Sequence, residues 1–152
     1  MKQRLQNDGL ARLLHDSLFK RMVAFCELYT PELPAEPVVN TWLSRLYQGD
    51  NNLHVLVTLD DNYNITGHGV IDVQDAYGYK VIFFHQAQVD RKSEASLDEG
   101  AEYVEKLSNQ IGAYCSIFVV AKHMKSLEKK YGYKSTRTIM MKYNSSDQTA
   151  TS

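Results

Sequence analysis

The chain of 152 residues is long enough to bury one hydrophobic core and short for two typical domains, so we predict a single domain. Hydrophobic residues make up 43% of the chain and charged residues 23%, which excludes a disordered or low-complexity protein. Lys and Arg number 17 against 18 Asp and Glu, and the net charge of -1 excludes a global positive field, so we expect neither nucleic acid nor a membrane surface as a partner.

Two helices are predicted within residues 1–49. The first runs from residue 7 or 8 to about Tyr29, because apolar side chains recur at steps of three and four residues: Leu10, Leu13, Leu14, Leu18, Met22 and Phe25. Three prolines then form a connector. The second helix ends at Gly49, and its apolar stripe is Val38, Val39, Trp42, Leu43 and Leu46. We expect both helices to pack on a sheet and to bury most of Trp42.

An antiparallel meander of three strands is predicted next. Residues 53–59 alternate and are rich in β-branched side chains, and a turn cluster separates them from a second strand at 65–73. The third strand, at 79–89, is apolar on both faces, which is typical of a central strand. If the turn before it centres on Ala76 and Tyr77, then His68 and His85 lie directly opposite each other, with Cβ atoms about 5 Å apart.

The remaining elements alternate between helix and strand. Ser96 and Glu99 have the spacing of a capping box, and an apolar stripe continues to Ile111 before Gly112, which predicts a helix. A short apolar strand at 115–121, a brief helix ending at Gly132 and an alternating strand at 136–143 follow. The predicted order is ααβββαβαβ, with a sheet core at 52–143 and a flexible tail at 144–152.

The cysteines and the first residues indicate the compartment. Cys26 and Cys115 lie 89 positions apart in apolar surroundings, without the spacing of a metal site or the density of a disulfide scaffold. We therefore expect two inert core thiols and no metal. Because the N-terminus has no apolar signal core and no run approaches the roughly 20 residues that span a bilayer, we expect a cytoplasmic protein.

The predicted order resembles the GCN5-related N-acetyltransferase (GNAT) superfamily over residues 52–143. Its most specific part, SLEKKYGYKS, is similar to the superfamily's signature of a short helix closing on Gly-Phe, with Gly132 and Tyr133 as the Gly-aromatic pair. The resemblance implies an α/β (α+β) fold in one domain, 1–143, whose mixed central sheet continues the meander with a parallel βαβ unit. It also implies an acyl-CoA-dependent N-acyltransferase that acetylates an amine with acetyl-CoA.

In that superfamily, the loop after the central strand binds the pyrophosphate of coenzyme A with the pattern Q/R-x-x-G-x-G/A. The corresponding loop here reads VDRKSEASLDEG, and neither register that we consider supplies the glycines, so we expect a degenerate cofactor site. The resemblance assigns the cofactor contacts to Val89, Arg91, Lys92 and Ser96. Three carboxylates at the same helix start oppose an anion by repulsion, although they suit the helix dipole: Glu94, Asp98 and Glu99.

The resemblance further implies a tyrosine that protonates the departing thiolate and a base that takes a proton from the amine. The tyrosine position corresponds to Glu128, so Tyr131 is the nearest candidate acid; in the alternative, Tyr131 packs on the sheet. His85 and His68 are the candidate bases, since imidazole exchanges protons near neutral pH. In the alternative for these histidines, both are half-buried strand residues with ordinary hydrogen-bond partners.

The missing glycines and tyrosine leave a second function open. In this alternative the chain is a non-catalytic protein with a GNAT fold, which acts in structure, assembly or regulation and binds a protein partner. Small proteins of this kind occur among tailed-phage products, and this short chain is similar to them. It would then reside in the host cytoplasm or the virion. Because a fold does not decide function, only the residues of the site can distinguish an N-acyltransferase from a non-catalytic protein with the same fold.

Overall fold

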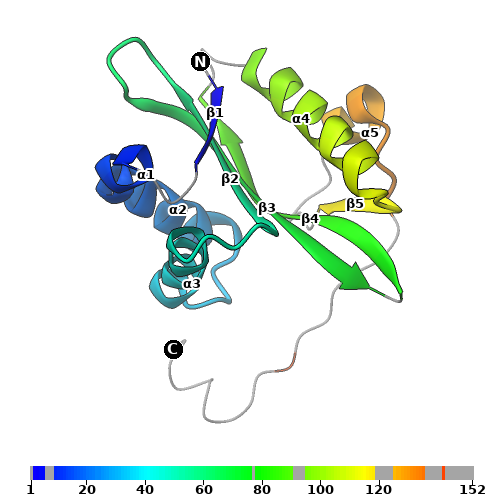
Figure 1. Cartoon of the computed structure of the whole chain (residues 1–152), viewed down its shortest axis with the longest axis horizontal. Coiled ribbons are helices and arrows are strands. Elements are labelled where there is room, and N and C mark those ends of the chain that lie inside the picture. The colour runs from blue at the N-terminus through cyan, green and yellow to red at the C-terminus, as the bar shows by residue number, and fades with distance from the viewer. Residues whose placement is uncertain are drawn as a thin grey trace.

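The computed structural model describes residues 2–5, 9–76, 78–90, 95–118, 125–135 and 142 (Figure 1). The helices are α1 (Gly9–Leu13), α2 (His15–Tyr29), α3 (Ala35–Tyr47), α4 (Ala95–Ile111) and α5 (Lys125–Tyr131). The strands are β1 (Lys2–Leu5), β2 (Leu53–Leu59), β3 (Ile65–Ala76), β4 (Tyr79–Val89) and β5 (Cys115–Phe118).

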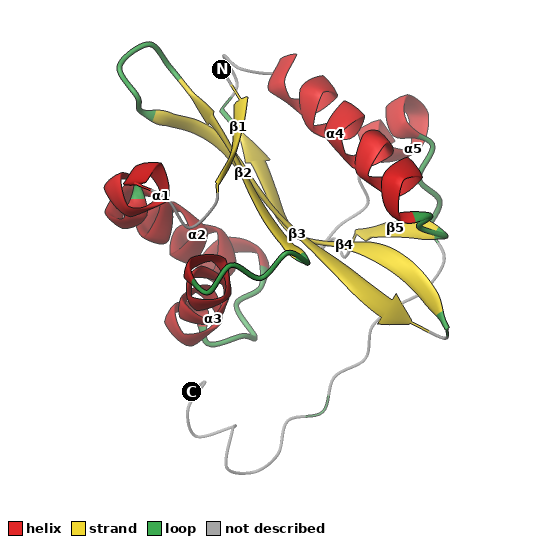
Figure 2. Ribbon diagram, viewed as in Figure 1, coloured by secondary structure: helices red, strands yellow, loops and turns green. Residues whose placement is uncertain are grey.

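The described strands form one mixed sheet in the order β1-β2-β3-β4-β5 (Figure 2). Neighbours from β1 to β4 are antiparallel, whereas β4 and β5 are parallel, with pairs from Val81 and Cys115 to Phe84 and Phe118. The mixed α+β sheet, in which a meander continues into a parallel pair joined through α4, is confirmed. The strand expected at 136–143 and the tail expected at 144–152 lie outside the described residues, apart from Lys142.

The N-terminal strand β1 is an element that the predicted order ααβββαβαβ lacks. Its four residues pair antiparallel with β2, from Lys2 opposite Thr58 to Leu5 opposite Val55. Three of the four side chains are polar, so the segment has no apolar alternation by which a strand is recognised. Backbone hydrogen bonds to the edge of β2, which no sequence pattern records, define this strand.

The first helix is interrupted at Leu14, where one continuous helix was predicted. Leu14 lies between α1 and α2 in a turn, and its side chain joins the core. Ala11 of α1 is buried three residues before Leu14, whereas Leu13 lies off this line of core positions and is 77% exposed. From Leu14 onward the core positions follow steps of four residues, through Leu18 and Met22.

The sheet separates two helical layers, with α1, α2 and α3 on one face and α4 and α5 on the other (Figure 1). The first core packs α2 and α3 on β2 and β3, and the second packs α4 on β2, β3 and β4. Trp42 of α3 is only 8% exposed. The expected packing of the N-terminal helices and the burial of Trp42 are therefore confirmed. Among the described residues, no helix has the length and apolarity needed to cross a membrane.

Gly67 of β3 has no room for a side chain. An added Cβ would lie 2.6 Å from the Oγ1 atom of Thr58 and 3.2 Å from the carbonyl oxygen of Gln88, which the sheet holds in place. We expect Gly67→Ala to lower the free energy of unfolding by about 1–3 kcal/mol through overpacking. Urea denaturation measures this loss.

Gly69 provides the matched control on the same strand. Its added Cβ would meet nothing closer than 3.8 Å, so Gly69→Ala is expected to change the free energy of unfolding by no more than about 0.5 kcal/mol. Equal urea midpoints for the two variants would contradict the steric argument.

Candidate active site

Strand β4 carries a one-residue bulge at His85. Its pairing with β3 joins Gln86 to Val70 and Phe84 to Ile71, so His85 is the extra residue between the two pairs. The pairing of β4 with β5 has its last described pair at Phe84 and Phe118. Bulges of this kind redirect a side chain and occur preferentially beside active sites.

The bulge places two consecutive side chains on the same face of the sheet. In a regular strand, successive side chains point to opposite faces. Phe84 packs in the core beneath α4, but both His85 and Gln86 point toward the N-terminal helices. The ring of His85 lies 4.9 Å from that of Trp42 on α3, and Gln86 donates to the carbonyl of Met22 on α2.

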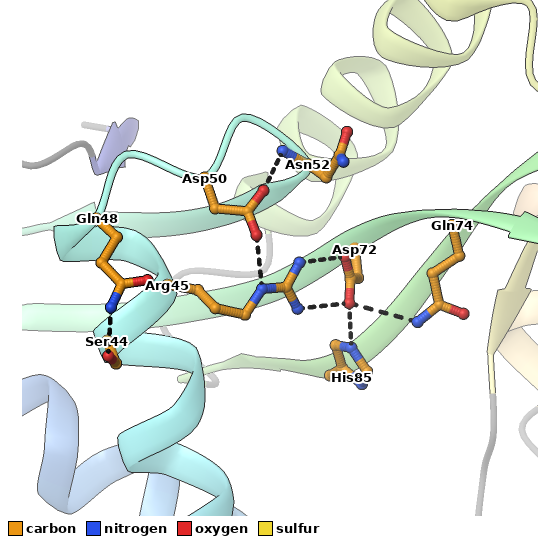
Figure 3. A network of polar contacts seen from close by, with 8 residues as sticks. All are labelled: Ser44, Arg45, Gln48, Asp50, Asn52, Asp72, Gln74 and His85. Carbon is orange, nitrogen blue, oxygen red and sulfur yellow. Dashed lines mark hydrogen bonds and ion pairs between the residues drawn. The ribbon is translucent and has the colours of Figure 1, made fainter.

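His85 is held by a network of charged and polar groups (Figure 3). Its Nε2 atom lies 3.1 Å from Oδ2 of Asp72 on β3, and this nitrogen donates because a carboxylate can only accept. Arg45 of α3 binds both oxygens of Asp72, at 2.8 and 2.9 Å. The amide of Gln74 donates to Asp72 at 3.3 Å. This arrangement orients the imidazole and leaves its Nδ1 atom as the acceptor.

The carboxylate of Asp72 is ionised although it is only 5% exposed. Burial alone would raise its pKa, but hydrogen bonds from Arg45, His85 and Gln74 outweigh burial and hold the pKa of Asp72 well below its usual range. The same pair raises the pKa of Arg45, with a second contribution from Asp50. A negative charge therefore lies directly behind the imidazole of His85.

The prediction that His68 lies opposite His85 is wrong. The hairpin pairs Ala76 with Tyr79, so the turn centres one position later than expected, and the bulge then shifts the register by one more residue. His68 consequently pairs with Gln88. The two histidines share a face of the sheet but belong to different networks.

His68 has both ring nitrogens bound to protein groups. Arg21 of α2 donates from Nε to its Nδ1 atom at 3.0 Å, so the proton of the neutral ring is on Nε2, which donates to the side-chain oxygen of Gln86 at 2.7 Å. Gln86 in turn donates to the carbonyl of Met22 and to the sulfur of Cys26. Burial, with the nearby charge of Arg21, lowers the pKa of His68 to about 4. The ring is thus neutral at physiological pH.

Tyr131, the candidate acid, is the last residue of α5. Its hydroxyl donates to Oδ1 of Asp98 on α4 at 2.9 Å, and Lys130 binds the same oxygen at 3.1 Å. Burial and the hydrogen bond to Asp98 raise the pKa of Tyr131, which keeps the phenol protonated. The hydroxyl therefore ends near the first turn of α4.

The cofactor residues implied by the resemblance are described only in part. Val89 is the last residue of β4, and the backbone of Ser96 lies in the first turn of α4. Arg91, Lys92 and Glu94 lie outside the described residues, as does the side chain of Ser96. Strand β4 ends at Val89 and helix α4 begins at Ala95, which confirms the predicted strand and the predicted helix on either side of this segment.

Arg21 fixes the chain at the start of that loop. Its Nη2 atom forms an ion pair of 2.9 Å with Asp90, the residue that follows β4, and its guanidinium also donates to the carbonyls of Ile65 and Thr66. The backbone amide of Asp90 donates to the carbonyl of Thr66 at 2.8 Å. The segment that enters the candidate cofactor loop is therefore bound to both α2 and β3.

Both cysteines are free thiols. Cys26 is buried, and burial raises the pKa of its thiol, which disfavours the reactive thiolate. Cys115 is half-buried at the start of β5. Among the described residues, no group of three or more His, Cys, Asp or Glu side chains is arranged to hold a metal ion.

Asp72 and Arg45 are site residues that the sequence interpretation missed. Asp72 shares the parity of His68 and Val70, so its position on the helix-facing side of β3 was readable from the strand pattern. A carboxylate at such a helix-facing, buried position needs a cationic partner, and this requirement is a signal that the sequence carries. Nothing in the spacing identified Arg45, 27 residues earlier, as that partner.

No family model and no curated protein matches the chain. Several solved structures, however, superpose on it over almost its whole length. A glucosamine-6-phosphate N-acetyltransferase from Arabidopsis thaliana superposes with a TM-score of 0.65 at 12% identity, over 94% of this chain and 97% of that chain. A ribosomal-protein-alanine N-acetyltransferase from Brucella melitensis biovar Abortus 2308 gives 0.64 at 10% identity, over 94% and 99%.

A third structure of this group is a complex with a bisubstrate analogue. AAC(6')-Iy in complex with the bisubstrate analogue CoA-S-monomethyl-acetylneamine superposes with a TM-score of 0.63 at 10% identity, over 95% of this chain and 96% of that chain. Identities this low establish the fold alone. The chain therefore has the fold of the GNAT N-acetyltransferases, as the sequence predicted.

Proposed function

We propose that the chain is an acyl-CoA-dependent N-acyltransferase that transfers an acetyl group to an amine. The observation that carries this proposal is the bulge on β4, which places an imidazole at the last described pair of β4 and β5 with a buried carboxylate behind it. His85 rather than His68 is the proposed base, because both nitrogens of His68 are already bound by protein groups.

The described residues at the start of α4 fit an anionic cofactor. Helix α4 begins at Ala95, shortly after the end of the central strand, and the first N–H groups of a helix, which have no intrahelical partner, favour phosphate oxygens. The carboxylate of Asp98 is bound by Lys130, which offsets its repulsion of an anion. Arg91 and Lys92 are the proposed additional cations. Without the loop glycines, we propose weak binding.

Each residue has a proposed task in the reaction. Acetyl-CoA, when bound, supplies a thioester whose carbonyl carbon forms the new C–N bond and whose C–S bond breaks. His85 accepts the proton that the amine nitrogen loses, at Nδ1, while its Nε2 proton stays hydrogen-bonded to Asp72. Tyr131 is the proposed donor of the proton that the departing thiolate takes up, and its raised pKa keeps it protonated until then.

Calorimetric titration with coenzyme A tests the cofactor site. We expect saturable binding to the wild type, and binding about fivefold tighter for Glu94→Gly, because one repelling charge near a phosphate costs on the order of 1 kcal/mol. Arg91→Glu should weaken binding about tenfold or more, since it replaces an attractive charge with a repulsive one.

The non-catalytic alternative expects no saturable binding by any of these three proteins. Tight wild-type binding that neither substitution alters would refute the placement of the phosphate site at residues 91–96. Release of free thiol from acetyl-CoA then tests turnover, with glucosamine-6-phosphate, neamine and an alanine-initiated peptide as the amines, chosen from the acceptors named for the structural neighbours.

A further inference from the structure

We infer that Asp72 and Arg45 form a positioning pair for His85, in which Asp72 fixes the tautomer of the imidazole and Arg45 limits its affinity for a proton. The inference rests on the proposed function in taking His85 as the base. It extends that function by assigning Asp72 and Arg45 opposite effects on the proton affinity of His85. Neither residue contacts the amine or the cofactor in the proposed reaction.

The role of Asp72 follows from the single hydrogen bond that it accepts from the ring. A carboxylate at Nε2 requires a proton there, so Nδ1 carries the lone pair that can receive a proton from an amine. The ring also contacts Trp42 and Phe83, with centroids 4.9 and 5.0 Å away. Packing alone would leave both tautomers available, whereas the carboxylate selects one.

The role of Arg45 follows from its bidentate contact with the same carboxylate. Both guanidinium Nη atoms bind Asp72, and the Nε atom binds Asp50 at 2.8 Å, so the guanidinium is held along its length. The oxygen that accepts from His85 also accepts from Arg45. Part of the negative charge behind the ring is therefore neutralised by Arg45, which makes a protonated ring less stable than beside a lone carboxylate.

The charged groups around His85 come from three segments. Asp72 of β3 contacts the ring, Arg45 of α3 acts through Asp72, and Asp50 after α3 acts through Arg45. Removing the negative charge of Asp72 and removing the positive charge of Arg45 should therefore have opposite effects on the protonation of His85.

NMR of the imidazole nitrogens tests the inference without any assay of turnover. Two-bond proton–nitrogen correlations of the wild type should show His85 with its proton on Nε2. In Asp72→Asn the ring should lose this preference, and the pH at which it takes up a proton should fall by about one pH unit. In Arg45→Gln the proton should stay on Nε2, and the protonation pH should rise by about one pH unit.

Asp75→Asn is the matched control, because it is the same change on the same strand at an exposed carboxylate that forms an ion pair with Lys80. Its His85 signals should match those of the wild type. If Asp72 and Arg45 had a merely structural role, Asp72→Asn and Arg45→Gln would both shift the protonation pH of His85 in the same direction. Such parallel shifts, or a wild-type ring with its proton on Nδ1, would overturn the inference.

Turnover separates this inference from the proposed function. If the chain acetylates an amine, the acidic limb of the pH–rate profile should move down in Asp72→Asn and up in Arg45→Gln, with an unchanged KM for acetyl-CoA. If the NMR pattern appears and no acceptor is acetylated, the positioning pair stands and the proposed function fails. If Asp72→Asn does not fold, Arg45→Gln and the wild-type tautomer still decide the inference.

Discussion

Replacing His85 by Gln is expected to lower kcat for amine acetylation by about 100-fold or more, because a positioned general base contributes about 10²–10⁴ to such a step. Glutamine can still donate to Asp72 but cannot accept a proton at neutral pH. The KM for acetyl-CoA should stay within about twofold, since the proposed cofactor contacts lie at the end of β4 and beyond it. Steady-state kinetics with the best acceptor of the panel measures both constants.

His15→Gln is the control for this substitution. His15 lies at the start of α2 and hydrogen-bonds Tyr47, which is not a member of the hydrogen-bond network of Asp72. Its kcat should equal that of the wild type. If His85→Gln retains the full kcat while His15→Gln behaves as expected, the proposed base is wrong, and the imidazole of His85 has a packing role beside Trp42.

Acid should destabilise the protein through His68 well before the carboxylates titrate. The pKa of His68 is about 4 in the folded chain against 6.5 for an ordinary histidine. Between these values the unfolded state binds more protons, so the stabilisation is complete above pH 6.5 and is lost as the pH falls toward 4. The expected loss is about 3 kcal/mol, since each unit of difference corresponds to about 1.4 kcal/mol.

The hydrogen bonds of His68 explain this loss. A proton on Nδ1 would face the Nε–H of Arg21, so protonation breaks the contact between α2 and β3 and adds repulsion between two cations. Asp72 and Asp50 have lowered pKa values, so their contributions are lost only below about pH 4, outside this window.

Urea denaturation at pH 7 and pH 4.5 measures the effect. The variant His68→Gln keeps a donor toward Gln86 but has no titrating group, so its free energy of unfolding should change much less between the two pH values. The variant is expected to be the less stable protein at pH 7, because Arg21 loses an acceptor. A loss as large as that of the wild type would assign the acid sensitivity to another residue.

The sequence determined most of the described elements and their general arrangement. Apolar side chains at helical spacing and the alternating runs at 53–59, 65–73 and 79–89 led to the helices and strands found there, because burial acts on such periodic patterns. The parallel pairing of β4 with β5 followed from one strand, one crossover helix and a second strand. The position of His85 on the central strand was predicted in the same way.

Other features depended on contacts between distant segments. The strand β1 exists through backbone hydrogen bonds to β2, and its polar side chains carry no trace of them. The interruption at Leu14 leaves the apolar spacing nearly unchanged, so periodicity predicts one helix where the structure has two.

The candidate site depends on both the sequence and the tertiary structure. The sequence places two histidines on neighbouring strands, but only the register of β3 and β4 decides which side chains each histidine contacts. A shift of one residue reverses the face of every later side chain, and the strand 79–89 is apolar on both faces, so its pattern does not reveal the bulge. Tertiary packing placed His85 beside Asp72 and Arg45, and His68 beside Arg21 and Gln86, because only the folded sheet brings these distant residues within hydrogen-bond distance.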